Sequence, residues 1–443
     1  MIKRNQLLGL IVAVCSLSTV QAQKVNFTEF DLDNGLHVIL HQDKTAPVVA
    51  VSVMYHVGSK NEDTGRTGFA HFFEHLLFEG SENIKRGEFM KVVSANGGQN
   101  NANTSQDRTF YYEVFPSNQL ELGLWLESER MMHPVINEIG VKTQNEVVKE
   151  EKRLRVDNQP YAQFAGEIFK RLFVNHPYRW QPIGSMQDLD AAKLEEFKNF
   201  FKKYYVPNNA VLTIAGDLDI EKTRTLVKQY FSEVPKGAPI KYVKQEETTM
   251  TRAIIDTAYD ANIQIPAIMT AYRVPGFTSK DARVMGLISQ VLSQGASSKL
   301  YKKMVDEKKN ALQVGALNYS LEDYGAYITY ALPNNNTPLN TLLKDIDDEI
   351  ALLQKNLIST ADYQKLINQF ENSYVTTNSR VLGVAENLAN GYTFYNKNTG
   401  NVNNELAEIK AITREDIREA AKKYLDVNKR VILYYLPAPT SSK

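Results

Sequence analysis

The chain has 443 residues, 43% of them apolar and 23% charged, which is ordinary for a folded globular protein with room for two or more cores. Its 51 basic and 51 acidic residues balance. Because there is no basic surplus of the kind that nucleic-acid binders carry, we expect neither DNA nor RNA as a partner.

The N-terminus has the pattern of a secretory signal peptide. Lys3 and Arg4 precede an apolar run over residues 7–20, and Val20 and Ala22 supply small side chains for a cleavage site. The run is short for a membrane span, although an uncleaved anchor is the alternative interpretation. We therefore expect cleavage after Ala22, a mature net charge near −2 and no stable membrane span in the mature chain.

Cys15, the only cysteine, lies inside this segment. The mature chain then has no thiol for a disulfide, a metal site or a nucleophile. Export without disulfides indicates a periplasmic or secreted protein.

Short β-rich runs alternate with longer helical patterns along the chain. Residues 48–55, 109–114 and 210–214 are typical of strands, whereas residues 120–132 and 341–354 are typical of helices without an internal proline. Helices longer than the strands predict an α+β fold, in which helices pack on one side of a mostly antiparallel sheet.

The segment HFFEH contains the residues with the clearest chemistry. His71 and His75 are four apart, so on a helix both imidazoles can reach one metal ion. Glu74 projects near the same face and can take a proton from a water that the metal polarises. A helix that carries two histidines by coincidence is the alternative, and this pattern arises by chance on the order of once per hundred such sequences.

A third protein ligand is needed, because catalytic zinc usually has three and keeps one open position. The acidic segment downstream looks helical and offers Glu146, Glu150 and Glu151. Spacing alone does not choose among the three, and an acidic helix is most often a solvated face.

The chain repeats itself. Residues 188–212 and 408–432 align without a gap at an offset of 220, and each reads as an amphipathic helix, a turn and a strand. Strand-like residues 48–57 and 266–274 each lead into a helix, and the second of these helices has Gly286–Gln290 where the first has HFFEH. We therefore predict two related domains, of which only the first can bind a metal.

The boundary between the domains falls in a polar stretch from Val234 to Arg252 that contains Pro235, Gly237 and Pro239. The predicted division is a signal peptide (1–22), a catalytic zinc-binding peptidase domain (23–235), a linker (236–251) and a homologous non-catalytic domain (252–443).

The motif and several later segments together resemble the pitrilysin/insulinase family of zinc peptidases, whose zinc motif is H-x-x-E-H. The resemblance covers nearly all of the mature chain. The matching segments are HFFEHLLFEGS from His71, Asn101-Ala102 with Thr104, Asp107-Arg108-Thr109, Tyr111-Tyr112, His176-Pro177-Tyr178, Ile183-Gly184, Tyr205 with Pro207-Asn208-Asn209, and Gly216-Asp217.

The resemblance implies a role for individual residues. The family's Val-Val pair followed by the zinc-binding Glu places the third ligand on Glu151, giving one Zn²⁺ per chain. Members often carry a Glu seven positions earlier, where this chain has Gln144, so a charge beside the ligands is missing. The family also implies that an extended peptide adds to the sheet edge that contains Asn101 and Ala102.

One departure from the family points to a partner. Members that act alone or as homodimers often carry an Arg and a Tyr seven residues apart in the second domain, which stabilise the developing oxyanion. Alignment places these positions at Val305 and Leu312, and neither side chain can donate a hydrogen bond. The hypothesis is that a homologous partner chain supplies the pair, as in mitochondrial processing peptidase and two-chain bacterial relatives.

The leading prediction is a zinc metalloendopeptidase that hydrolyses short or unfolded peptides as the zinc-bearing chain of a heterodimer. Two alternatives remain open. The chain could be a non-catalytic scaffold subunit of a larger complex, or a zinc-binding protein without peptidase action. Manganese or cobalt could also replace zinc, because N and O ligands accept several divalent ions.

Overall fold

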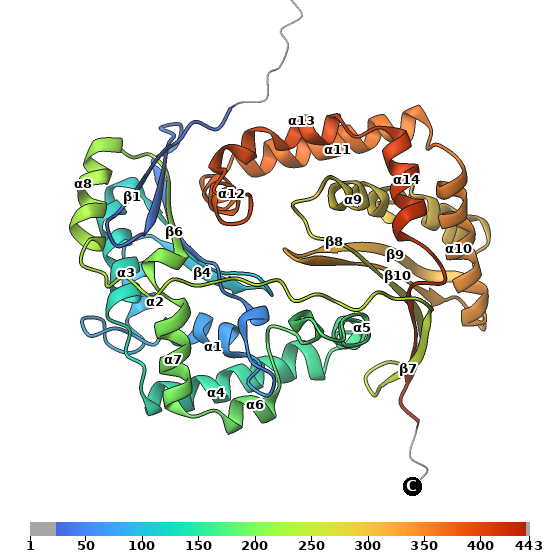
Figure 1. Ribbon diagram of the computed structural model, residues 1–443, viewed down its shortest axis with the longest axis horizontal. Coiled ribbons are helices and arrows are strands. Elements are labelled where there is room, and N and C mark those ends of the chain that lie inside the picture. Colours follow the sequence, from blue (N-terminus) through green and yellow to red (C-terminus); the bar gives the residue numbers. More distant parts are fainter. Residues whose placement is uncertain (1–23, 440–443) are drawn as a thin grey trace, which may run out of the picture.

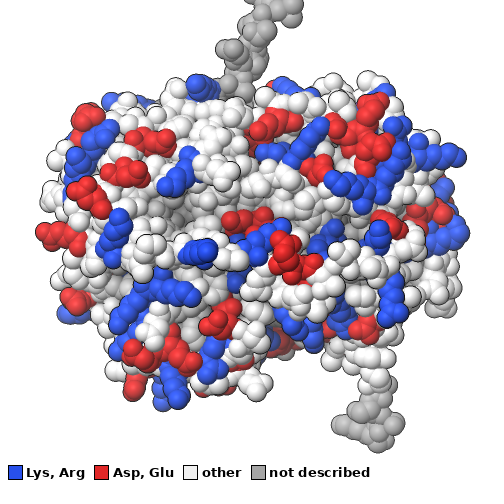
Figure 2. Space-filling view, in the orientation of Figure 1, with Lys and Arg blue, Asp and Glu red and all other residues white. Residues whose placement is uncertain are grey.

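The computed structural model describes residues 24–439, so the predicted signal peptide lies outside the described residues. The chain forms two halves, each built on one sheet (Figure 1). Among the described residues, no helix is both long and apolar enough to cross a bilayer. Figure 2 shows Lys and Arg interspersed with Asp and Glu over one face, as the balanced composition leads one to expect.

The first half contains a six-stranded sheet in the order β1-β2-β6-β3-β5-β4. Only β2 and β6 run parallel, and the other pairs are antiparallel. The strands are β1 (Thr28–Asp31), β2 (His37–Gln42), β3 (Val48–Tyr55), β4 (Gln99–Thr104), β5 (Thr109–Pro116) and β6 (Ala210–Gly216). In this order β4 is an edge strand that pairs only with β5.

The second half repeats this arrangement with five strands in the order β7-β11-β8-β10-β9. The parallel pair is now β7 and β11. The strands are β7 (Ile254–Asp260), β8 (Ala267–Pro275), β9 (Ala311–Ser320), β10 (Tyr324–Pro333) and β11 (Val431–Pro437). The predicted α+β class, with two related and mostly antiparallel sheets, is confirmed.

Helices repeat in the same order. The first half contains α1 (Phe69–Leu76), α2 (Phe89–Ala95), α3 (Leu120–Met132), α4 (Glu138–Lys152), α5 (Phe164–Leu172), α6 (Met186–Ala191), α7 (Leu194–Tyr204) and α8 (Ile220–Phe231). The second contains α9 (Lys280–Ser293), α10 (Leu339–Lys355), α11 (Thr360–Asn378), α12 (Val381–Phe394), α13 (Glu405–Lys410) and α14 (Arg414–Tyr424). Both ends of α7 and α14 differ by 220 residues, which is the offset seen in the sequence.

Helices of the same half cover one face of each sheet. A helix of the other half packs on the opposite face. The core under α1, α3 and α7 includes Val53 and Leu212, whereas Met54 and Val211 pack with Leu388 of α12 on the opposite face. Helix α5 of the first half packs in turn on β8 and β11 (Figure 1). This exchange explains why the central strands are buried along their whole length rather than alternately.

Residues 232–253 form neither helix nor strand and run between the halves (Figure 1). The predicted linker falls within this segment. Tyr242 holds it against the first half, because its ring stacks on His56 at 4.1 Å and its hydroxyl donates to Asn209 Oδ1 at 2.6 Å.

Candidate metal centre

Gly68 and the buried Glu62 stabilise the N-terminal end of helix α1. Gly68 has a left-handed φ of 98°, and Glu62 accepts hydrogen bonds from Gly68 N and Ala70 N, both at 2.9 Å. A β-carbon on Gly184 would lie 2.5 Å from the Gly68 backbone, so the Ile183-Gly184 segment packs directly on the start of this helix.

Two tyrosines of the matching segments hold α1 along its length. Tyr111 Oη donates to the carbonyl of Phe73 at 2.8 Å, and Tyr205 Oη donates to that of Ala70 at 3.3 Å. Phe72 and Phe73 are fully buried beneath the helix. The motif's aromatic residues therefore fix the helix, and its histidines are left to face α4.

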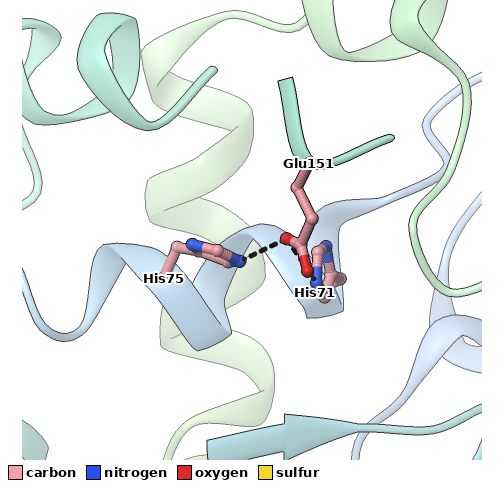
Figure 3. Close-up of side chains that lie close together, drawn as sticks. All are labelled: His71, His75 and Glu151. Carbon is pink, nitrogen blue, oxygen red and sulfur yellow. Dashed lines mark ion pairs between the residues drawn. The ribbon is translucent and has the colours of Figure 1, made fainter. Parts of the chain in front are cut away.

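Helix α4 brings Glu151 to the two histidines (Figure 3). Glu151 Oε2 lies 3.5 Å from His71 Nε2 and 3.1 Å from His75 Nε2. Val148 is fully buried and sits one turn before Glu151 on the same face, whereas Glu146 and Glu150 point to solvent. Geometry thus chooses among the three acids that spacing left open.

The donor set fits a divalent ion such as zinc. One atom from each of the three side chains lies within 4.8 Å of the others, and two imidazole nitrogens with one carboxylate oxygen are typical of catalytic zinc. Glu151 Oε2 is buried, and the two imidazole Nε2 atoms are the polar atoms beside it. A buried carboxylate oxygen between two imidazole nitrogens is an arrangement that a divalent cation stabilises.

The surroundings keep His71 neutral and the Glu151 carboxylate charged. Burial, followed by the neighbouring His75, lowers the pKa of His71 to about 4. The hydrogen bond from His75 lowers the pKa of Glu151 despite partial burial. Both effects favour the deprotonated forms that bind metals.

Glu74 differs from Glu151 in its setting. Burial raises the pKa of Glu74, and the hydroxyl of Thr104 on β4 opposes this shift. Glu74 therefore has a higher proton affinity than an exposed carboxylate, and its helix α1 lies against the edge strand β4.

Two further residues, Arg155 and Gln144, have contacts beside the candidate metal centre that the HFFEH motif does not predict. Arg155 Nη1 is ion-paired with Glu151 Oε1 at 2.8 Å, whereas Oε2 is the oxygen nearest to both histidines. Arg155 lies in a π-helical turn (Arg153–Asp157) directly after α4, and no spacing rule predicts that turn. Gln144 donates to Glu79 Oε1 at 2.5 Å, so this chain pairs an amide with an acid at the position where relatives often have another acid.

The predicted substrate residues lie on the exposed edge of the first sheet. Asn101 and Ala102 pair with Tyr112 and Tyr111 of β5 on one side only. Ala102 N donates to Asn101 Oδ1 at 2.9 Å, so this N–H points to the open side of β4 and is held by its neighbour's side chain.

The positions aligned with the family's Arg/Tyr pair lie in the second half. Val305 is half-buried in a π-helical segment (Tyr301–Glu307), and Leu312 at the start of β9 is 52% exposed. Both are apolar, so neither position of the described chain provides an oxyanion donor.

Comparison with known proteins places this site in a family. The model "Insulinase (Peptidase family M16)" matches residues 37–177, and "Peptidase M16 inactive domain" matches residues 191–370. The zinc protease PqqE of Helicobacter pylori is 34% identical over 344 residues, which span 76% of this chain and 77% of that protein. The chain belongs to the M16 peptidase family.

Solved structures agree with this M16 assignment. A protease from Helicobacter pylori superimposes with a TM-score of 0.88 at 30% identity, covering 94% of this M16 chain and all of the other. The periplasmic protease PqqL from Escherichia coli, at a TM-score of 0.74 and 18% identity, shares the fold over 94% of this chain and 48% of its own.

Proposed function

We propose that this chain is a zinc metalloendopeptidase in which His71, His75 and Glu151 bind the metal and Glu74 is the general base. The observation that carries the proposal is the convergence of the three donors on the helix that also carries the half-buried Glu74. A scaffold subunit has no use for this complete set.

Each residue has a defined task in peptide hydrolysis. When bound, zinc polarises the scissile carbonyl and makes water more acidic. The Glu74 carboxylate takes a proton from the attacking water and later delivers it to the leaving amine nitrogen. Its raised pKa suits both steps, because a weakly acidic carboxyl group accepts the proton more readily at neutral pH.

The edge of β4 supports a peptide as the substrate. Its outer side has no partner strand among the described residues, and the Ala102 N–H is already directed there. An extended peptide can add to this edge and replace the Asn101 side chain as the acceptor. Short or unfolded chains can adopt that conformation, whereas folded proteins cannot.

The M16 chain is proposed to act with a homologous partner that contributes the Arg/Tyr pair. The apolar side chains at Val305 and Leu312 motivate this split. Export to the periplasm rests on the predicted signal peptide at residues 1–22, and PqqL, which shares the fold, is described as periplasmic.

The catalytic role is tested with Glu74→Gln in the zinc-loaded chain, assayed with a quenched fluorescent peptide library. We expect hydrolysis to fall by several orders of magnitude while bound zinc, measured by metal analysis, stays at one per chain. Glu82→Gln, which removes an exposed carboxylate beside His133, should keep full activity. Loss of zinc together with activity would make Glu74 a structural residue rather than the base.

The partner is tested by adding the homologous chain to the same assay, with and without a chelator. Chelator-sensitive cleavage that needs both chains supports the split site. Equal cleavage by this chain alone discards the partner and keeps the peptidase. Absence of cleavage under every condition with zinc present favours the scaffold alternative.

A further inference from the structure

The connection between the two halves has no main-chain support over residues 239–246 (Figure 1). Among residues 24–439, the hydrogen bonds of this stretch come from the side chains of Tyr242 and Glu246, and none comes from its main chain. Residues 241–246 are all exposed, and Val243 is 70% exposed. Because a protease binds the main chain of an extended substrate, this stretch can enter a protease without the unfolding of a helix or strand.

Both ends of this stretch are anchored. At the first end, Gly237 N donates to Asn208 Oδ1 at 2.7 Å. At the second end, Glu247 Oε2 accepts from the successive backbone N–H groups of residues 174–176 at 2.9, 3.0 and 2.9 Å. Burial opposes ionisation of Glu247, but these hydrogen bonds outweigh it and lower its pKa. A cut between the two anchors therefore leaves each new end attached to the first half.

Tyr242 fastens the middle of the stretch. Its ring stacks on His56 with 4.1 Å between the ring centres, and its hydroxyl donates to Asn209 Oδ1 at 2.6 Å. Two cavities of about 480 Å³ each are lined in part by Tyr242, and residues 238–245 line one of them. The chain on either side of the ring therefore packs loosely on the protein, and release of Tyr242 removes both the stacking and the hydrogen bond that hold it.

The stretch offers two lysines to a protease that recognises basic side chains. Lys241 and Lys244 are both exposed. Lys244 Nζ lies 4.0 Å from the centre of the Tyr324 ring, a surface contact that the binding pocket of a protease can replace. Lys236 is exposed as well, but the N–H of the next residue, Gly237, is already hydrogen-bonded. The contacts therefore favour a cut after Lys241 or Lys244 over one after Lys236.

Contacts outside the connecting stretch also join the two halves. Phe169 of α5 is buried in one cluster with Met269 and Leu433 of the second sheet, and α12 packs in the same way on the first sheet. Val25 N donates to Asn403 Oδ1 at 2.8 Å, and Asn403 Nδ2 donates to the carbonyl of Val25 at 3.0 Å. Burial of apolar surface between the halves does not depend on the peptide bond that links them, so the halves should stay together after a cut.

We propose that residues 239–246 are a proteolytic processing site, cut after Lys241 or Lys244 by a protease specific for basic residues, and that the two fragments stay together as one folded protein. The cut adds one water across the peptide bond, which leaves a carboxylate on the first fragment and an amine on the second. The half with the metal ligands is then no longer covalently joined to the other half. The proposal does not rest on the peptidase function proposed above, because none of its observations involves the metal ligands.

The test is limited digestion of the purified chain with trypsin, with the intact masses of the products followed over time. We expect the first cut after Lys241 or Lys244, and a later cut after Lys236. Native mass spectrometry and gel filtration should then show the two fragments as one complex with the metal content of the uncut chain. The protein purified from cells that export it should already contain a fraction cut at the same bond.

Three variants locate the cut and its control. A chain with both Lys241→Gln and Lys244→Gln should lose the first cut. Tyr242→Ala should speed the first cut about tenfold, because cleavage follows the population of the released stretch, and Tyr242→Phe, which keeps the stacking, should fall between it and the wild type. Lys302→Gln is the matched control and should change nothing, because Lys302 is exposed but its N–H is bonded to the carbonyl of Ser298 at 3.0 Å.

Three results would overturn the proposal. The first is an initial cut outside residues 239–246, and the second is a pair of fragments that separate or unfold once cut. The third is the absence of any cut chain in the exporting cells, which would make the stretch sensitive to trypsin alone. Trypsin should cut the Glu74→Gln chain at the wild-type rate, so the processing site and the peptidase function can fail separately.

Discussion

At the scale of single residues, the HFFEH motif predicted which side chains could carry the chemistry, but it did not predict which neighbours hold those side chains in place. His71, Glu74 and His75 follow from helical spacing, and the structure faces both histidines toward Glu151. The choice of Glu151 needed the family resemblance, although burial of Val148 on the same face of α4 is the physical reason for it. Glu151 and Arg155 have the i, i+4 spacing at which acid–base pairs form on a helix, so the pair was visible in the sequence, but that spacing does not show that the pair lies beside a metal centre.

Arg155 provides the first residue-scale prediction. Its guanidinium holds Glu151 Oε1 and leaves Oε2 to the metal, so Arg155→Ala should weaken zinc binding by about 10- to 100-fold. A competition titration with a chromophoric chelator measures this change, and the spectrum of the cobalt-substituted chain should report altered carboxylate coordination. The metal-free variant should unfold at the wild-type temperature, because the Arg155 side chain is 76% exposed. Unchanged affinity would show that α4 alone orients Glu151.

At the scale of elements, the repeat predicted which helices and strands exist but not where each helix packs. Residues 48–55 and 120–132 form the strand and helix that their patterns indicate. An amphipathic pattern states that a helix has an apolar face, but it does not name the sheet that covers it. The sequence therefore could not predict that α5 packs on the second sheet and α12 on the first, even though the offset of 220 relates the two helices.

Strand β4 provides the element-scale prediction. Ala102→Pro removes an N–H that points to the open edge and leaves the pairing with β5 intact. Loss of one peptide hydrogen bond should cost about 1 kcal/mol, or roughly fivefold in affinity for a long peptide, with little change in stability.

Asn103→Pro is the comparison variant. The N–H of Asn103 faces β5, because N–H groups alternate along a strand, so this variant should lower the unfolding temperature as well. Anisotropy titration and thermal unfolding of both variants distinguish the two effects. If both proline variants are equally destabilised, the Ala102 N–H bonds to β5 and the prediction is wrong.

At the scale of the whole molecule, several matching segments that have no contact with the metal centre meet at the seam between the halves. Lys60 is buried among Asp107 at 3.0 Å, Asp323 at 3.7 Å and Glu322. Two histidines extend this cluster: His56 reaches Glu322 at 2.8 Å, and His176 reaches Asp323 at 3.1 Å. Tyr178 and the Glu322 backbone N–H also donate to Asp107. Segments that match the family but do not contact the metal centre thus join the two halves. The sequence alone does not reveal such contacts, because Asp107 and Glu322 are 215 positions apart.

This cluster predicts how the two halves respond to acid. Burial opposes ionisation of Glu322 and Asp323, but hydrogen bonds from His56 and His176 and the charge of Lys60 outweigh it and lower both pKa values. The unfolded chain therefore takes up protons first as the pH falls below about 4.5, and the stability that the ionised pairs contribute is lost in that range.

Lys60→Met tests this argument, because it leaves buried carboxylates without their cation. At pH 7 it should lower the free energy of unfolding by about 3–5 kcal/mol, and the difference from wild type should shrink as acid neutralises the carboxylates. Urea unfolding between pH 7 and pH 4 measures both quantities, and Lys202→Met on the exposed side of α7 is the control. A difference that stays constant with pH would mean that Lys60 acts through the packing of its side chain, since only its charge couples to the protonation of Glu322 and Asp323.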